Sequence, residues 1–117
     1  MKTILIIEDE ERSREALIRK IRQYHGNDIE VDVAGNGLKG VKRAMVLHPD
    51  LIFMDVEMPI MDGLEASVII NRQLSTARIV FLTAYDKFQY VVEAMRSGAK
   101  DYLLKPVQEN ELHRILD

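Results

Sequence analysis

Five short apolar runs, separated by segments with helical spacing, constrain the fold of this chain more than any other feature. The runs are Thr3–Ile7, Ile29–Val33, Leu51–Met54, Ile79–Leu82 and Tyr102–Leu104. They are predominantly apolar rather than alternating, which is the pattern of strands buried on both faces of a sheet. A single helix between successive strands produces right-handed β–α–β units, so we expect a parallel sheet covered on both sides.

The segments between these runs carry apolar residues at the spacing of one helical face. The stripes are Leu17, Ile18, Ile21 and Tyr24; Leu38, Val41 and Met45; Leu64, Val68 and Ile70; Val91, Val92 and Met95; and the beginning of a fifth at Leu112, Ile115 and Leu116. Ser13 and Asn36 stand where helix N-caps are expected, and Gly26 and Gly98 where helices should end. Five β–α units predict an α/β fold with a doubly wound five-stranded parallel sheet, (βα)5. The flavodoxin-like strand order 2-1-3-4-5 comes from the fold analogy, not from the residues.

Length, charge and cysteine content narrow the class of protein. The 117 residues suffice for one domain, so residues 1–117 are expected to form a single unit. A net charge of -3 gives no basic face for nucleic acid, and the absence of cysteine excludes disulfides and thiolate metal sites. No apolar run approaches a membrane span, and the N-terminus becomes acidic too early for a signal peptide. We therefore expect a cytoplasmic domain with no membrane association.

Chemically active side chains follow four of the five predicted strands. The first strand is followed by Glu8–Glu11, the third by Asp55, the fourth by Thr83 and the fifth by Lys105. In an open parallel sheet, ligands bind beyond the carboxyl ends of the strands where the strand order reverses. With the order 2-1-3-4-5, that point lies between the first and third strands. The fold is therefore expected to bring Asp9 and Asp55 together, with Thr83 and Lys105 on the far side.

Carboxylates that share a pocket repel one another and need a compensating charge. An all-oxygen donor set without histidine or cysteine favours Mg²⁺ over Zn²⁺. The charge of Lys105 and the hydroxyl of Thr83 complete the kind of electrostatic clamp that phosphoryl transfer needs. Asp55 can then act as the nucleophile that becomes an aspartyl phosphate.

Four sequence motifs carry a family resemblance. They are IIEDE (6–10), DLIFMDVEMPIMDGLE (50–65), IVFLTAY (79–85) and GAKDYLLKP (98–106). Each motif is weak alone, but the four in this order, each at a strand end, are specific. Over essentially its whole length, the chain resembles the receiver domain of two-component response regulators.

The resemblance implies a phosphorylation site with a bound metal. Asp55 would accept a phosphoryl group from a sensor histidine kinase, and the domain would catalyse its own phosphorylation and dephosphorylation without acting as an enzyme on other molecules. Mg²⁺ would be bound by Asp9, Asp55 and the backbone carbonyl of Glu57, and by Glu8 through water. Glu8 stands where many family members have aspartate, so its longer side chain is expected to alter metal affinity while Asp9 stays a direct ligand.

The resemblance also implies a switch. Thr83 and Lys105 would contact the phosphoryl group, and Tyr102 would be the aromatic residue whose rotamer follows Thr83. The altered surface would be the face formed by the fourth helix, the fifth strand and the fifth helix. A cis Lys105–Pro106 bond is expected, as is an effect of Tyr85 and Glu57 on the lifetime of the phosphoryl group, with the bulk of Tyr85 slowing the attacking water.

The resemblance further implies partners. The altered face would control a C-terminal output domain that is absent from these 117 residues, or would form a homodimer on phosphorylation. The output domain is expected to bind DNA and regulate transcription, as an AraC-type helix-turn-helix or a LytTR domain. The receiver itself is not expected to bind nucleic acid.

Three other functions compete with this interpretation. A flavodoxin-like electron carrier needs a phosphate-binding loop after the first strand, where Glu8–Glu11 would repel the flavin phosphate. A phosphatase with an aspartyl nucleophile would typically place that residue after the first strand with a second acid two residues later. Asp9-Glu10-Glu11 is a poor match to that pattern, and no substrate cap is present. A non-phosphorylated interaction module would be expected to have lost at least one of Asp9, Asp55, Thr83 and Lys105, and all four are present.

Overall fold

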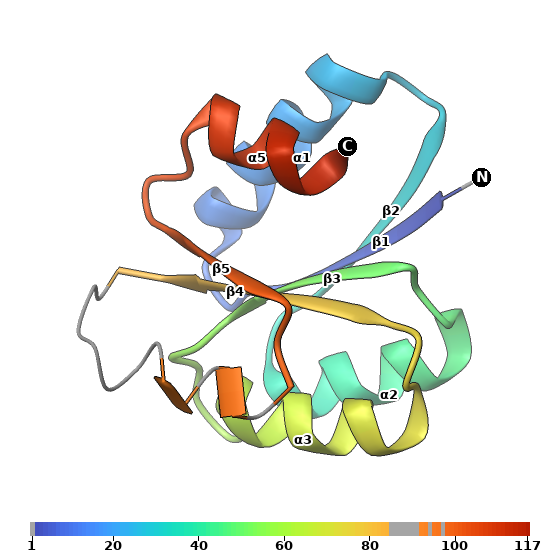
Figure 1. The fold of residues 1–117 in the computed structure, drawn as a ribbon, viewed down its shortest axis with the longest axis vertical. Helices are drawn as coiled ribbons and strands as arrows, with labels where there is room; N and C mark the ends of the chain where they lie inside the picture. The colour runs from blue at the N-terminus through green and yellow to red at the C-terminus, as the bar shows by residue number, and fades with distance from the viewer. Residues whose placement is uncertain (1, 85–91, 94, 97) are drawn as a thin grey trace.

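One five-stranded parallel sheet forms the centre of the molecule (Figure 1). The computed structural model describes residues 2–84, 92–93, 95–96 and 98–117. The strands are β1 (Lys2–Ile7), β2 (Ile29–Ala34), β3 (Leu51–Asp55), β4 (Arg78–Thr83) and β5 (Asp101–Leu104). Their order is β2-β1-β3-β4-β5, which confirms the predicted topology and makes β2 and β5 the two edges.

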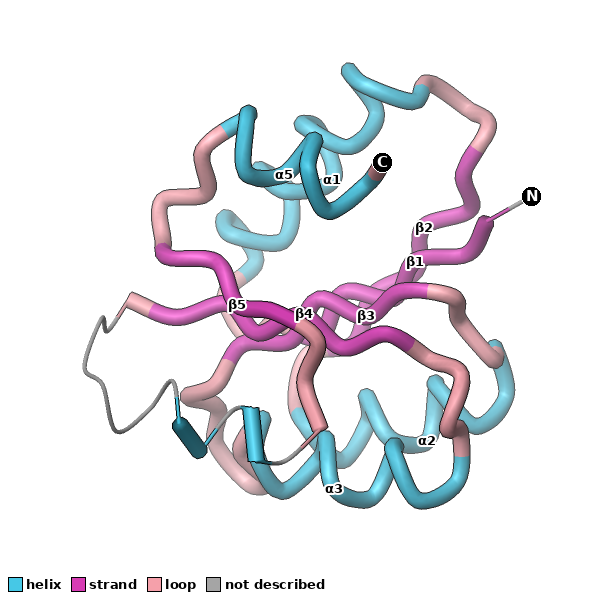
Figure 2. The backbone as a smooth tube through the Cα atoms, viewed as in Figure 1, coloured by secondary structure: helices cyan, strands magenta, loops and turns pink. Residues whose placement is uncertain are grey.

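Helices cover both faces of the sheet. They are α1 (Glu11–His25), α2 (Gly37–Leu47), α3 (Gly63–Gln73) and α5 (Glu109–Leu116). Helices α1 and α5 lie on one face and α2 and α3 on the other, as Figure 2 shows in cyan on either side of the magenta strands. The predicted helix around 91–95 falls largely outside the described residues; within that segment, 92–93 and 95–96 are helical. Within the part of the chain that the structure describes, every helix is too short or too polar to cross a membrane.

The sheet divides the core into two layers. On β1, Leu5 and Ile7 contact the layer beneath α2 and α3, whereas Ile4 and Ile6 contact the layer beneath α1 and α5. The inner strands are apolar on both faces because both layers bury them. Strand β2 differs from that expectation: Glu30 is exposed and only its two ends are fully buried. Its position at an edge of the sheet explains the difference, since helices cover an edge strand less completely.

The helix boundaries correct one capping prediction. Asn36 caps α2 as predicted, because its Oδ1 accepts a hydrogen bond of 2.8 Å from a backbone N–H three residues later. Ser13 is not an N-cap, because α1 begins two residues earlier and Glu10 occupies the cap position. The backbone N–H of Arg14 already donates to the Glu10 carbonyl, so the first helical turn is closed before Ser13 could cap it. Gly26 ends α1 with a positive φ of 64°, as expected of glycine there.

The start of α3 fixes the end of β3. Asp62 caps α3 by accepting a hydrogen bond of 2.9 Å from a backbone N–H. The next residue, Gly63, donates its own N–H to the Val56 carbonyl at 2.9 Å. A Cβ on Gly63 would lie 2.3 Å from the carbonyl oxygen of Asp55, which is too close for any side chain. This close packing holds the backbone of Asp55 in place.

Candidate functional site

Three carboxylates meet at the carboxyl ends of β1 and β3. Glu8 and Asp9 follow β1, and Asp55 is the last residue of β3. One oxygen from each lies within 4.8 Å of the others. Glu8 and Asp55 are 1% and 7% exposed, whereas Asp9 is exposed to solvent. The adjacency of β1 and β3 in the sheet produces this cluster, as the topology predicts.

Lys105 lies against the two buried carboxylates from the end of β5. Its Nζ is 2.7 Å from Oε1 of Glu8 and 3.4 Å from Oδ1 of Asp55. The backbone N–H of Lys105 donates to the Thr83 carbonyl at 2.8 Å, which ties together the ends of β4 and β5. The Lys105–Pro106 bond is cis, as expected. The shorter of the two contacts joins Lys105 to Glu8, a pairing that the sequence analysis did not anticipate.

The two buried carboxylates cannot both be ionised without cost. Burial, together with the neighbouring Glu8 carboxylate, raises the pKa of Asp55 to about 8. Burial alone would raise the pKa of Glu8 as well, but contacts with Asp55 and Lys105 lower it overall. Burial opposes the charge on Lys105, yet its hydrogen bond to Glu8 raises the pKa of the ammonium group. In the absence of a cation, the pair of carboxylates therefore holds one proton at neutral pH.

One oxygen of the cluster is left without a partner. Oε2 of Glu8 is buried and makes no hydrogen bond to any described residue. A buried carboxylate oxygen without a donor is costly, and a bound cation would compensate it. Three carboxylates and no nitrogen or sulfur ligand suit a hard divalent cation such as Mg²⁺. The residues present therefore fit a magnesium site.

The other predicted site residues are buried to different extents. Thr83 is the last residue of β4 and is 5% exposed, one position beyond the residue that pairs with Asp55. Tyr102 is half-buried on β5 and packs against the core layer beneath α2 and α3. The side chain of Glu57 is exposed and does not join the carboxylate cluster. Tyr85 lies outside the described residues.

Sequence reasoning missed Arg14, a basic residue of α1 that supports the cluster. Its Nη1 donates a hydrogen bond of 2.8 Å to the backbone carbonyl of Glu8, which fixes the turn between β1 and α1. A basic residue in the first turn of a helix that follows an acidic strand end was a usable signal.

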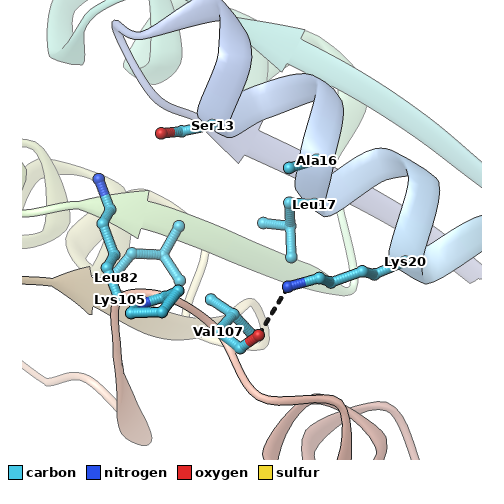
Figure 3. Close-up of a pocket in the computed structure, with 8 residues that line it drawn as sticks. Ser13, Ala16, Leu17, Lys20, Leu82, Lys105 and Val107 are labelled. Carbon is cyan, nitrogen blue, oxygen red and sulfur yellow. Dashed lines mark hydrogen bonds between the residues drawn. The ribbon is translucent and has the colours of Figure 1, made fainter.

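A cavity of about 320 Å³ lies beside Lys105, between α1 and the segment after β5 (Figure 3). Lys20 spans it, donating a hydrogen bond of 2.7 Å to the Val107 carbonyl. Its remaining walls are mainly apolar and include Leu17 and Leu82. The cavity therefore borders the site on the side of Lys105.

Comparisons with known proteins agree on one family. The model of the response regulator receiver domain matches residues 4–117. A response regulatory protein of Yersinia pestis is 36% identical over 116 residues, covering 99% of this chain and 47% of that protein. The transcriptional regulatory protein BtsR of Escherichia coli is 37% identical over 114 residues, covering 97% of this chain and 46% of that protein. The chain thus spans about half the length of these curated relatives.

Solved structures agree with the sequence relatives. The chemotaxis protein CheY4 of Vibrio cholerae has a TM-score of 0.89 and 25% identity, covering 99% of this chain and 96% of that one. A LuxR-family DNA-binding response regulator from Staphylococcus aureus has a TM-score of 0.87 and 27% identity, with coverage of 99% and 96%. The fold, the cluster of carboxylates and these matches together show that the chain belongs to the response regulator receiver domain family.

Proposed function

We propose that Asp55 is the phosphoacceptor of this receiver and takes its phosphoryl group from a phosphohistidine of a sensor histidine kinase in a Mg²⁺-dependent reaction. The observation that carries the proposal is the position of Asp55 between two acidic neighbours and Lys105 at the end of a buried strand. Burial holds the nucleophile rigidly, and its neighbours supply the charges that phosphoryl transfer needs.

Asp9 and Asp55, with the backbone carbonyl of Glu57, are the proposed ligands of Mg²⁺, and Glu8 acts through water. The unpartnered Oε2 of Glu8 supports its participation. When bound, the cation supplies positive charge to the oxygens of the phosphoryl group. It also favours the ionised form of Asp55, which is the nucleophilic form.

The reaction is an in-line displacement at phosphorus. A carboxylate oxygen of Asp55 forms the new P–O bond while the P–N bond to the kinase imidazole breaks, and the imidazole leaves with the bonding electrons. Lys105 offsets the charge of the transferred group, which draws its ammonium away from Glu8. The hydroxyl of Thr83 donates a hydrogen bond to a phosphoryl oxygen. A water later hydrolyses the acyl phosphate by the same in-line route.

The signal is proposed to leave the site through Thr83 and Tyr102. When Thr83 moves toward the phosphoryl group, Tyr102 turns inward and changes the face that includes β5 and α5. That face then binds an output domain or a second receiver. BtsR and the E. coli regulatory protein AtoC are longer than this chain, which matches 46% and 24% of their lengths. We therefore infer that residues 1–117 form a single receiver and that it controls a transcriptional output domain. We place the receiver in the cytoplasm.

The experiment is intact-mass spectrometry after incubation with acetyl phosphate, with and without Mg²⁺. We expect one phosphoryl adduct that requires Mg²⁺, is absent in Asp55→Asn and persists in the matched surface variant Asp28→Asn. Isothermal titration calorimetry with Mg²⁺ measures metal binding in parallel. Metal binding without any adduct, even with a phosphorylated histidine kinase as donor, would favour a module that signals by binding alone.

A further inference from the structure

The outward face of α2 carries cations and exposed apolar side chains together. The helix buries Gly37, Gly40 and Ala44 toward the sheet. Its opposite face exposes Leu38, Lys39, Lys42, Arg43 and Val46. We call these five residues the α2 surface.

The helical spacing makes the α2 surface continuous. Leu38, Lys42 and Val46 follow one another at i, i+4 and i+8, so they form one row about 12 Å long. Lys39 and Arg43 form a second row beside it, also at i and i+4. Val46 is 73% exposed and Leu38 is 39% exposed. Val46 is therefore mostly uncovered by the described chain and Leu38 is partly exposed, and both stand among three cations.

The charge of the α2 surface opposes that of the chain. The whole chain has a net charge of -3, yet α2 contains no aspartate or glutamate. Arg43 pairs with Asp32 of β2 at 2.5 Å. Among the described residues, no salt bridge engages Lys39 or Lys42. The two lysines are thus available to carboxylates of another molecule.

The position of α2 places the α2 surface away from the face that includes β5 and α5. Helix α2 packs on β1 and β2, and β2 is one edge of the sheet. Strand β5 forms the other edge, and Figure 1 shows α5 on the opposite face of the sheet from α2. A partner on the α2 surface can therefore bind while the face that includes β5 and α5 is occupied.

We propose that the α2 surface docks an acidic amphipathic helix of a partner protein. Carboxylates of that helix would pair with Lys39 and Lys42, and an apolar residue between them would cover Val46. Glu30, which is exposed on the adjacent edge strand, and Asp32 would repel a continuous polyanion such as a DNA backbone or an anionic bilayer. Separate carboxylates on a helix can reach the lysines and avoid those acids.

The test titrates the isotope-labelled domain with a synthetic helix bearing glutamate and leucine on one face, and follows backbone amide shifts by NMR. We expect shifts confined to 37–47, and affinity about tenfold lower for the double variant Lys39→Glu/Lys42→Glu. The matched control Arg19→Glu/Lys100→Glu makes the same change in net charge at exposed sites elsewhere and should bind as the unmodified domain does.

Two further arms make the test decisive. Val46→Ser should weaken binding of the same peptide at high salt, because the apolar contact is not screened. A duplex DNA and phosphatidylglycerol vesicles should give no shifts on α2. Equal weakening by both double variants, or tighter binding of DNA or vesicles than of the peptide, would overturn the proposal. The Asp55→Asn domain should bind the peptide normally, so this result does not depend on the phosphoryl chemistry.

Discussion

At the scale of single residues, the raised pKa of Asp55 bears most directly on the proposed chemistry of the site. Burial and the nearby Glu8 raise the pKa of Asp55 to about 8, so Asp55 is largely protonated at neutral pH when no cation is bound. A protonated carboxyl is a poor ligand and a poor nucleophile. With Asp55 in its proposed roles of metal ligand and phosphoacceptor, metal binding, proton release and nucleophilicity would be linked at one carboxyl group.

The affinity for Mg²⁺ should consequently depend on pH. Between pH 6 and pH 8, each unit of pH raises the ionised fraction of Asp55, so we expect an increase of up to about tenfold per unit, levelling off above the pKa. Isothermal titration calorimetry at several pH values measures it. In Asp55→Asn, the remaining binding should be weak and nearly independent of pH. An affinity that stays flat from pH 6 to pH 8 in the unmodified domain would contradict a raised pKa of Asp55.

The same raised pKa sets the sign of a stability effect. Between about pH 4 and pH 8, folded Asp55 holds a proton that the unfolded chain has released, so its contribution to the free energy of unfolding decreases as pH rises. At pH 8 without metal, Asp55→Asn should therefore be more stable by roughly 1–3 kcal/mol. Urea unfolding measures the difference, with Asp28→Asn as the surface control. The gain should shrink toward pH 5, and a gain that grows there would exclude this origin.

At the scale of elements, the β3–α3 junction depends on a glycine. A Cβ at Gly63 would meet the Asp55 carbonyl oxygen at 2.3 Å, whereas a Cβ at Gly35 finds its nearest atom at 3.8 Å. Gly35 follows β2 and Gly63 begins α3, both at the carboxyl edge of the sheet, but only Gly63 is in close contact with the end of β3.

We therefore expect Gly63→Ala to lower the free energy of unfolding by roughly 1–3 kcal/mol, because backbone must move to admit the methyl group. Gly35→Ala should change it by less than about 0.5 kcal/mol. Chemical denaturation compares the two variants. Gly63→Ala should also slow phosphorylation of Asp55 by acetyl phosphate, since α3 can no longer hold β3 in position. Equal stabilities of the two variants would show that the junction relaxes freely.

Most elements could be predicted because their signals are local. Runs such as Leu51–Met54 are apolar throughout, and Asn36 is a strong capping residue, so neither depends on distant contacts. The Ser13 prediction was wrong because hydroxyl residues also occur inside first turns, and the Glu10–Arg14 backbone bond decided the boundary. The partial exposure of β2 was missed although Glu30 and Asp32 interrupt its apolar residues, a local signal that this strand is less completely buried than the others.

At the scale of the whole molecule, one ion pair connects the first and last strands of the chain. Lys105 and Glu8 are 97 positions apart in sequence and 2.7 Å apart in space. The sequence pattern predicted that both residues follow the ends of strands, and therefore that they share a site. It could not reveal that they pair directly, because that depends on side-chain lengths and on the depth to which Glu8 is buried.

Removing that lysine should cost stability across the whole fold. Lys105→Ala leaves Glu8 buried beside Asp55 without its cation, so we expect a loss of roughly 2–4 kcal/mol at pH 8 without metal. Saturating Mg²⁺ should recover part of that loss, because the metal supplies the missing positive charge. Thermal unfolding with and without Mg²⁺ measures both effects, and Lys100→Ala serves as the exposed control. A loss that Mg²⁺ does not reduce would mean that Lys105 acts mainly through packing.

The distance along the chain between Glu8 and Lys105 also bears on synthesis at the ribosome. The acidic end of β1 is made first, while the lysine arrives only with the end of β5. A nascent chain that lacks β5 has Asp55 and its acidic neighbours but not the lysine that lies against them. Under the proposed function, the domain would become competent to receive a phosphoryl group only once β5 has been synthesised and has docked on β4.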